Sequence, residues 1–366
     1  MIEILCADHP DTTALFLSLP RLLYPKKLCV QNRAEEEQLL TGTHILSKYF
    51  TCSPFVALCD GKPAARCAVT LYPDSSDAYF GFFDSVDDER VASALLCAAE
   101  QYAAAQGRKR MVGPVDASFW IRYRLKVGGY EGRPYVSEPY HKPYYLALLK
   151  ACGYGVSVEY VSNRYARLPK KDYQILKYQN RYQEFIAQGY EIRSPKRSEW
   201  DVAIRDVYRL VIRLYSDFPV FSYLSEEDFC ALFATYKILL DFSMVKLAYF
   251  GGEAVGFFIG MPDYQNRLYG SVTPLTLLYV LAKRIRSRRY VMLYLGVDPQ
   301  HRGLGKAITQ TIIENVHHKR AESIGAFIRR GKITEDYVKE QKQGVYEYVL
   351  LEKSLEERHE DNSPVA

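Results

Sequence analysis

The hydrophobic residues of the chain follow two periods in alternation, that of a strand and that of a helix. Residues 290–297 form an apolar run with the length of a buried strand, and residues 304–318 carry apolar side chains at helical spacing. Residues 56–65 and 245–256 have apolar arms around a glycine turn, which predicts two β-hairpins. This order of elements predicts an α+β fold with mixed, mostly antiparallel sheets flanked by helices.

The predicted elements occur twice along the chain. In each half a hairpin precedes a strand and a long helix. A tyrosine, Tyr145 or Tyr337, then lies in a predicted helix before the last strand. The interval between these tyrosines nearly equals the interval between the hairpin glycines Gly61 and Gly252. The same order of elements therefore occurs twice, which predicts two domains of the same architecture.

The division between the two domains is predicted near residue 168. There an apolar strand gives way to a charged segment, as is common at domain boundaries. The 366 residues suffice for two cores, so we expect one domain at 1–168 and a second at 169–356. Residues 357–366 are charged and have no apolar period, which predicts a disordered tail.

The loop between the strand at 290–297 and the helix that follows is the most informative segment of the sequence. It contains Gly303 and Gly305, which let a ligand approach the main chain closely. The first N–H groups of a helix have no partner within the helix, and the helix dipole favours an anion there. The segment therefore predicts a phosphate-binding site.

The pattern of this loop is that of a known family. The V-x-P-x-x-R-G-x-G-x-A/G motif is matched by Val297, Pro299, Arg302, Gly303, Gly305 and Ala307. The chain thereby resembles the GNAT N-acetyltransferases, and the repeat makes it similar to members with two fused GNAT-like domains. The resemblance implies that acetyl-CoA binds with its pyrophosphate on the residues Arg302, Gly303, Leu304, Gly305, Lys306 and Ala307.

The resemblance also implies where the acyl group is transferred. The strand before the loop is expected to splay from its neighbour, so that the backbone of Leu295, Gly296 and Val297 holds the pantetheine arm. A main-chain N–H beside the thioester would stabilise the developing oxyanion. Tyr337 is the implied general acid for the departing thiolate.

No general base follows from the sequence. The acidic residues Asp217, Glu226, Glu227 and Asp228 flank an aromatic segment where family members build the acceptor wall. One of them could bind an ammonium group. Ser225 followed by three acids is also typical of a helix N-cap, here for a helix predicted at 229–240, and we favour that interpretation.

The first domain lacks the phosphate-binding pattern. Residues 84–90 carry three aspartates and a glutamate and no glycine, and acids at a helix start satisfy the dipole and repel a pyrophosphate. This domain is predicted not to bind CoA through the loop. Its tyrosines and one histidine, Tyr135, Tyr140, His141, Tyr144 and Tyr145, could border a ligand cleft or form a packed connection.

Composition and charge narrow the classes of function. A net charge of +5 argues against a nucleic-acid-coating protein. The basic run at 283–289 could meet a phosphate, an acidic lipid surface or RNA, but a solvated lead-in to the next strand is favoured. No C-x-x-C or H-x-x-x-H pair occurs, and no apolar run could span a bilayer. We therefore expect a cytoplasmic protein without a metal or a membrane partner.

These observations predict an acetyl-CoA-dependent N-acetyltransferase that moves an acetyl group to a primary amine of a small molecule or peptide by direct attack on the thioester. Two alternatives stay open. The chain could bind CoA in a regulatory role without turnover, or it could use an aminoacyl-tRNA as donor. The second alternative would not need a pyrophosphate loop.

Overall fold

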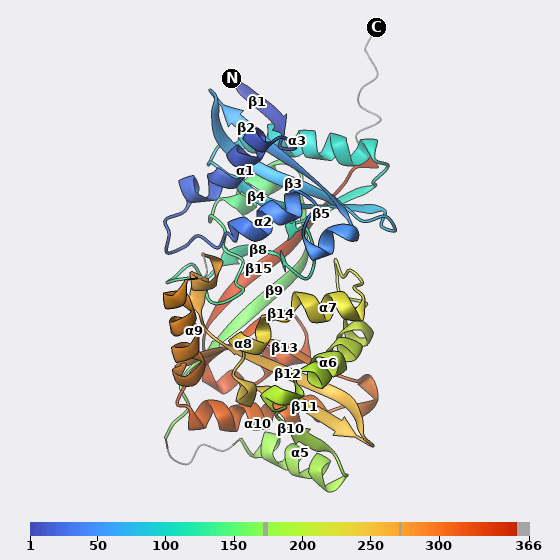
Figure 1. Ribbon diagram of the computed structural model, residues 1–366, viewed down its shortest axis with the longest axis vertical. Coiled ribbons are helices and arrows are strands. Elements are labelled where there is room, and N and C mark those ends of the chain that lie inside the picture. The colour runs from blue at the N-terminus through green and yellow to red at the C-terminus, as the bar shows by residue number, and fades with distance from the viewer. Residues whose placement is uncertain (171–174, 271–272, 357–366) are drawn as a thin grey trace. The chain divides into compact units, whose positions relative to one another are not determined.

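A computed structural model describes residues 1–170, 175–270 and 273–356. The chain divides into two compact units (Figure 1). Unit 1 comprises Met1–Tyr160 and Glu347–Ala366, and unit 2 comprises Val161–Tyr346. The tail predicted at 357–366 lies outside the described residues.

Unit 1 is a sheet with helices packed on it. Its strands lie in the order β1 (Ile2–Cys6), β2 (Thr51–Cys59), β3 (Lys62–Leu71), β4 (Asp77–Ser85), β5 (Arg110–Gly113) and the end of β15 (Lys342–Ser354). Its helices are α1 (Pro10–Leu23), α2 (Arg33–Leu40), α3 (Glu89–Ala105) and α4 (Tyr145–Ala151). The apolar face of α3, with Leu95 and Ala99, packs in one core with Phe80 and Met111. The short strands β6 (Val115–Asp116), β7 (Arg122–Tyr123) and β8 (Leu125–Gly128) follow β5.

Unit 2 repeats this plan. Its strands lie in the order β9 (Gly155–Tyr165), β14 (Glu322–Arg329), β13 (Arg289–Val297), β12 (Glu253–Pro262), β11 (Val245–Phe250) and β10 (Glu191–Arg193). Its helices are α5 (Leu176–Ala187), α6 (Trp200–Tyr215), α7 (Glu226–Leu232), α8 (Tyr236–Leu239), α9 (Pro274–Arg286) and α10 (Leu304–His318). The apolar side chains of α10, among them Ile308 and Ile312, share a core with Phe258 and Tyr290. Both predicted hairpins and the predicted mixed sheets are confirmed.

The border between the units falls inside two strands, β9 and β15. Near its end, β15 pairs with β5, with Leu351 opposite Gly113, and this segment completes the sheet of unit 1. The segment of β9 from Val161 onward lies next to β14 and belongs to unit 2. The compact units therefore differ from the linear segments 1–168 and 169–356, because strand pairing assigns the end of the chain to unit 1.

Two predicted helices are not formed as expected. Tyr337 does not lie in an α-helix: it follows the 3₁₀ helix η6 (Ile333–Asp336), and a second 3₁₀ helix, η7 (Lys339–Gln341), precedes β15. Left-handed Val338 separates the two turns, and segments this short cannot offset the cost of helix nucleation. The helix predicted at 229–240 is divided into α7 and α8.

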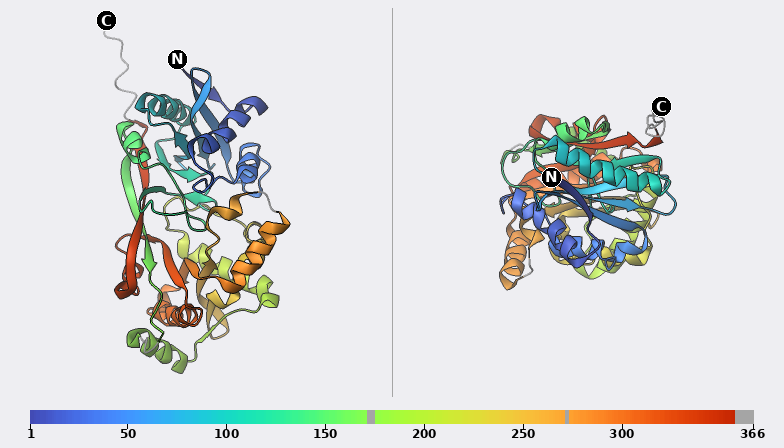
Figure 2. Two further views of the ribbon diagram at one scale, coloured as in Figure 1. Left: turned by 90° about the vertical axis from the view of Figure 1, so that its left-hand side faces the viewer. Right: turned by 90° about the horizontal axis from the view of Figure 1, so that it is seen from above.

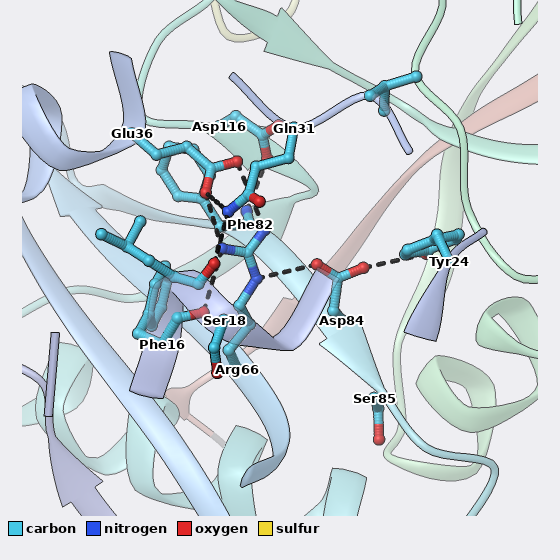
Figure 3. A network of polar contacts seen from close by, with 12 residues as sticks. Phe16, Ser18, Tyr24, Gln31, Glu36, Arg66, Phe82, Asp84, Ser85 and Asp116 are labelled. Carbon is cyan, nitrogen blue, oxygen red and sulfur yellow. Dashed lines mark hydrogen bonds and ion pairs between the residues drawn. The ribbon is translucent and has the colours of Figure 1, made fainter. Parts of the chain in front are cut away.

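A buried ionic network joins the elements of unit 1 (Figure 3). Arg66 of β3 donates to Asp84 Oδ2 at 2.9 Å and to Glu36 Oε2 at 2.8 Å, and its guanidinium lies 4.8 Å from the centre of the Phe16 ring. Gln31 donates to the same Glu36 oxygen at 2.8 Å. Burial alone would lower the pKa of Arg66, but Glu36 and Asp84 outweigh it and raise that pKa. The network thus ties α1 and α2 to β3 and β4 through one cation.

Replacing Arg66 with methionine should destabilise unit 1 strongly, because it leaves Glu36 and Asp84 buried without the guanidinium. Breaking a buried ion pair in this way costs about 3–5 kcal/mol of unfolding free energy, which urea denaturation of the full chain would measure. Arg90→Met is the matched control, since Arg90 and Asp88 form an exposed pair, and it should leave the urea midpoint unchanged. Equal urea midpoints for the two variants would contradict the stabilising role of the Arg66 network.

Candidate functional site

The strands β13 and β14 separate in the middle of unit 2. Their parallel ladder runs from Arg289 opposite Glu322 to Met292 opposite Gly325, although β13 continues to Val297. On its other edge β13 stays paired with β12, with a register shift at Leu293. Such a bulge bends the strand and increases its twist. The end of β13 therefore presents backbone beyond the β14 ladder, as the predicted splay requires.

The open end of β13 contains the three residues expected to hold the pantetheine arm. The Leu295 carbonyl accepts a hydrogen bond from the Tyr215 hydroxyl of α6 at 3.3 Å. A Cβ at Gly296 would collide with the Phe257 ring and lie 2.9 Å from Leu214 Cδ1. Glycine at this position is thus required by close packing on the α6 side.

The loop after β13 is held in place by side chains. The Asp298 carboxylate accepts from the Gln300 N–H at 3.0 Å and pairs with Arg213 of α6 at 2.8 Å. The Tyr190 hydroxyl lies 2.6 Å from His301 Nδ1. These contacts fix the direction in which the chain enters α10.

The helix α10 begins without a side-chain cap among the described residues. Its N-cap is Gly303, with left-handed φ of +98°, a conformation that favours glycine. By contrast, α3 of unit 1 is capped by Asp88, whose carboxylate accepts from the Arg90 N–H at 2.9 Å. The Lys306 N–H donates to the Gly303 carbonyl at 3.2 Å, whereas no side chain of the described residues accepts from the N–H groups before it. The start of α10 therefore keeps these N–H groups and its partial positive charge for an anion.

Cations from α5 lie beside the start of α10. The Arg181 guanidinium is 3.6 Å from the position a Cβ would take on Gly303, and Arg181 also pairs with Glu184 at 2.8 Å. Partial burial, and then the charges of Lys177 and Arg181, lower the pKa of Lys306. Within the described part of the chain, Lys177 and Lys306 make no ion pair. Like charges gathered at a helix N-terminus suit a polyphosphate.

Tyr337 reaches this loop, although not from a helix. Its hydroxyl lies 3.2 Å from the position of a Cβ on Gly305, and its ring packs edge-on against Tyr178 at 5.9 Å between centres. The Tyr165 hydroxyl donates to the Tyr337 carbonyl at 2.9 Å. Burial, and then the neighbouring Tyr178, raise the pKa of Tyr337 to about 12. The phenol is therefore protonated at neutral pH.

Sequence reasoning missed the contribution of α5. Lys177 and Arg181 are four residues apart and so share one helix face, a spacing that the sequence shows. The packing of this face against α10 depends on the tertiary structure, and the spacing of the residues does not predict it. Tyr178 and Tyr165 were missed for the same reason.

The acidic segment before α7 forms a helix cap. The Ser225 hydroxyl accepts from the Asp228 N–H at 3.2 Å and donates to the Asp228 carboxylate at 2.7 Å. Glu226 lies 3.6 Å from Arg205 of α6. The favoured N-cap interpretation is confirmed, and no general base is assigned.

The corresponding gap in unit 1 is filled by the chain itself. The ladder of β4 with β5 ends at Tyr79 opposite Val112, and β6 then runs so close to Gly81 that a Cβ there would lie 2.8 Å from Asp116 Cα. The Asp116 carboxylate accepts from the Phe82 N–H at 2.6 Å. These contacts and the capped α3 support the prediction that unit 1 does not bind CoA through its loop.

A further backbone donor of unit 1 is satisfied at the end of β4. The Tyr145 hydroxyl accepts from the Ser85 N–H at 3.0 Å and donates to Asp84 at 3.2 Å. The tyrosine of α4 thus closes on the strand backbone of its own unit. In unit 2, the tyrosine at the equivalent place in the repeat approaches the glycine loop instead.

The tyrosine-rich segment of unit 1 is internally bonded. Glu138 is contacted by Lys126, by the Tyr348 hydroxyl at 2.8 Å and by the Tyr135 N–H at 3.1 Å. His141 Nδ1 accepts from the Lys126 N–H at 3.0 Å, and burial lowers the pKa of His141 to about 3. This histidine is therefore neutral, and the contacts favour the packed connection.

The described residues contain neither a candidate metal site nor a candidate membrane span. Across residues 1–170, 175–270 and 273–356, no three His, Cys, Asp or Glu side chains are grouped so as to hold a metal ion. No helix in these segments combines the length and apolarity needed to cross a bilayer.

Comparison with known proteins identifies similar folds. No protein-family profile matches the sequence. A tandem GNAT protein from the clavulanic acid biosynthesis pathway has a TM-score of 0.51 and 12% identity, with 97% of this chain and 99% of that chain covered. The GCN5-related glucosamine N-acetyltransferase region of a fungal multi-domain GH3 β-N-acetylglucosaminidase has a TM-score of 0.52 and 14% identity, covering 96% and 38%. At such identities the likeness establishes the fold.

Two curated proteins are similar in sequence. Protein YghO of Escherichia coli K12 is 23% identical over 243 residues, which are 64% of this chain and 62% of that protein. A bacterial ceramide synthase of Caulobacter vibrioides is 24% identical over 195 residues, which are 52% of this chain and 49% of that protein. The match thus spans about half to three fifths of each relative.

Proposed function

We propose that this chain, which has the tandem GNAT fold, is an acyl-CoA-dependent N-acyltransferase whose donor site lies in unit 2. One observation carries the proposal: the open end of β13 leads directly into the uncapped start of α10, beside cations from α5. An open strand edge suits the thioester arm of a nucleotide-linked thioester, and the anion site that follows it along the chain suits the phosphates. The simplest donor is acetyl-CoA, and the acceptor is a primary amine of a small molecule or peptide.

The residues present fit this donor. The N–H groups of Gly303, Leu304 and Gly305 would hold the pyrophosphate, together with Lys177 and Arg181. Left-handed Gly303 lets the phosphate approach the main chain, where a Cβ would occupy the space beside Arg181 at van der Waals distance. The backbone of Leu295, Gly296 and Val297 would align the pantetheine arm. When bound, the coenzyme supplies an activated acyl group.

The chain's own groups would then orient the reactants. A backbone N–H near the end of β13 would stabilise negative charge on the thioester oxygen, and direct attack by the amine needs no covalent enzyme intermediate. Tyr337, protonated at neutral pH, would give its proton to the departing thiolate, and the proton that the amine loses as the amide forms would restore the phenol. In its other role Tyr337 would donate a hydrogen bond to the coenzyme. The two roles predict different kinetics.

The length of the acyl group is open to experiment. A ceramide is a fatty amide, so the name of the Caulobacter relative motivates donors longer than acetyl. We propose to titrate the full chain with acetyl-CoA and long-chain acyl-CoA by calorimetry, and then to screen amines by mass spectrometry. Amide formation would support the proposal. Binding without turnover would favour a regulatory protein, and no binding of any acyl-CoA would refute the donor site.

Gly303→Val should abolish binding of the preferred acyl-CoA, because it places a branched side chain where the pyrophosphate approaches the helix. Gly189→Val is the matched control: Gly189 has a similar φ of +89° and nothing within 4 Å of an added Cβ. Both variants carry comparable backbone strain. Calorimetry should show binding lost only for Gly303→Val, and an unchanged affinity in this variant would remove the loop from the site.

Charge reversal on α5 should weaken the same binding. Lys177→Glu and Arg181→Glu each replace an attraction to phosphate by a repulsion, and we expect an affinity loss of roughly tenfold or more at low salt. The loss of affinity should become smaller as the salt concentration rises, because Lys177 and Arg181 are partly exposed and salt screens their charges. Lys27→Glu, on unit 1, makes the same change in net charge and should have no effect. Equal affinities in all three variants would contradict the role of α5.

Tyr337→Phe separates the two roles of this tyrosine. A proton donor predicts a fall in kcat on the order of 100-fold with unchanged KM for the acyl-CoA. The ratio to the unmodified protein should stay constant from neutral into moderately alkaline pH, because the pKa of Tyr337 is about 12. A raised KM with unchanged kcat would indicate coenzyme binding. Tyr249→Phe, which removes a hydroxyl bonded to Asp206, is the control in the same unit.

A further inference from the structure

The helix α9 of unit 2 has an unusual surface. Leu275, Leu278 and Ile285 are exposed to 77%, 62% and 69%, whereas Val280 is the buried residue of the helix. These three residues are spaced by three and seven positions, so they lie on one face of the helix, whereas Leu277, with 46% exposure, lies on another face. Figure 2 shows α9, in orange, at the rim of unit 2 and apart from the strands of that unit.

Other side chains of α9 anchor the helix to its own unit. Arg284 donates to the Ile238 carbonyl of α8 at 3.0 Å, and the Tyr279 hydroxyl donates to the Tyr264 carbonyl at 3.4 Å. The Arg267 guanidinium lies over the Tyr279 ring at 4.8 Å. The helix is thus held in one orientation, with Leu275, Leu278 and Ile285 outward.

Basic residues border the exposed apolar face. The segment 274–289 contains five Lys and Arg residues and no acid: Lys283, Arg284, Arg286, Arg288 and Arg289. Arg289 is neutralised by Asp263 at 2.7 Å. Lys283, Arg286 and Arg288 form no ion pair with any residue that the structure describes. Three unneutralised cations therefore stand at the end of the helix that exposes the apolar face.

We infer that α9 docks the protein on an anionic lipid surface. An amphipathic helix with apolar side chains on one face and cations beside them lies in the plane of a bilayer interface, where the apolar face enters the acyl boundary and the cations meet lipid phosphates. A nucleic acid would satisfy the cations but leave the leucines in water. The lipid surface is the partner that satisfies both.

The inference concerns binding alone and can fail independently of acyl transfer. Its test is sedimentation of the full chain with vesicles of phosphatidylcholine, with or without phosphatidylglycerol. The protein should sediment with the anionic vesicles and remain in solution with the neutral ones. Retention by RNA without binding to anionic vesicles would overturn the inference.

Variants identify the helix as the docking element. Leu278→Glu with Ile285→Glu should lower vesicle binding at least about tenfold, since charged groups on the inserted face oppose burial in lipid. Leu22→Glu, at an α1 leucine with 67% exposure, is the matched control and should bind normally. Far-ultraviolet circular dichroism would confirm that each variant is folded. Equal binding of the double variant and the unmodified chain would overturn the inference.

A reporter tests insertion directly. Leu278→Trp should show fluorescence that brominated lipids quench in anionic vesicles, whereas Leu22→Trp should not be quenched beyond the unmodified chain. Quenching of both reporters to the same extent would indicate a different docking surface and would contradict the assignment to α9.

Discussion

The candidate site depends on the separation of two strands that begin as neighbours. The ladder between β13 and β14 stops at Met292, and a bulge at Leu293 keeps β13 paired with β12 while its direction changes. If the ladder continued, the N–H and C=O groups of Leu295 to Val297 that face β14 would bond to that strand, and no ligand could bind them. The helix start at Gly303 follows this strand end, and no side chain of the described residues caps its N–H groups.

The two units show what keeps such a gap available. In unit 1 the gap is closed by β6, by the Asp116 carboxylate on the Phe82 N–H and by Tyr145 on the Ser85 N–H. The Asp88 cap satisfies the helix start of α3. The two units share one fold, and local side chains decide whether the backbone groups at the gap bond within the protein or remain available to a ligand. Unit 1 also contains the buried ionic network around Arg66.

Local patterns predicted the parts of the structure that neighbouring residues control. The hairpins, the strand at 290–297, the helix from Leu304 and the Ser225 cap follow from periodicity, glycine and capping chemistry. The prediction of a helix around Tyr337 was wrong, because two short 3₁₀ turns replace it. The α5 cations at the site and the outward leucines of α9 could not be predicted, since packing between distant elements decides which helix face is covered.

The interleaved course of β9 and β15 constrains how this protein can be divided. Because the end of β15 belongs to the sheet of unit 1, and β9 from Val161 belongs to that of unit 2, a gene cut at residue 168 would give two products that each lack a strand of their own sheet. Each half of the sequence supplies a strand segment to the sheet of the other unit, so neither half carries all the strands of one unit.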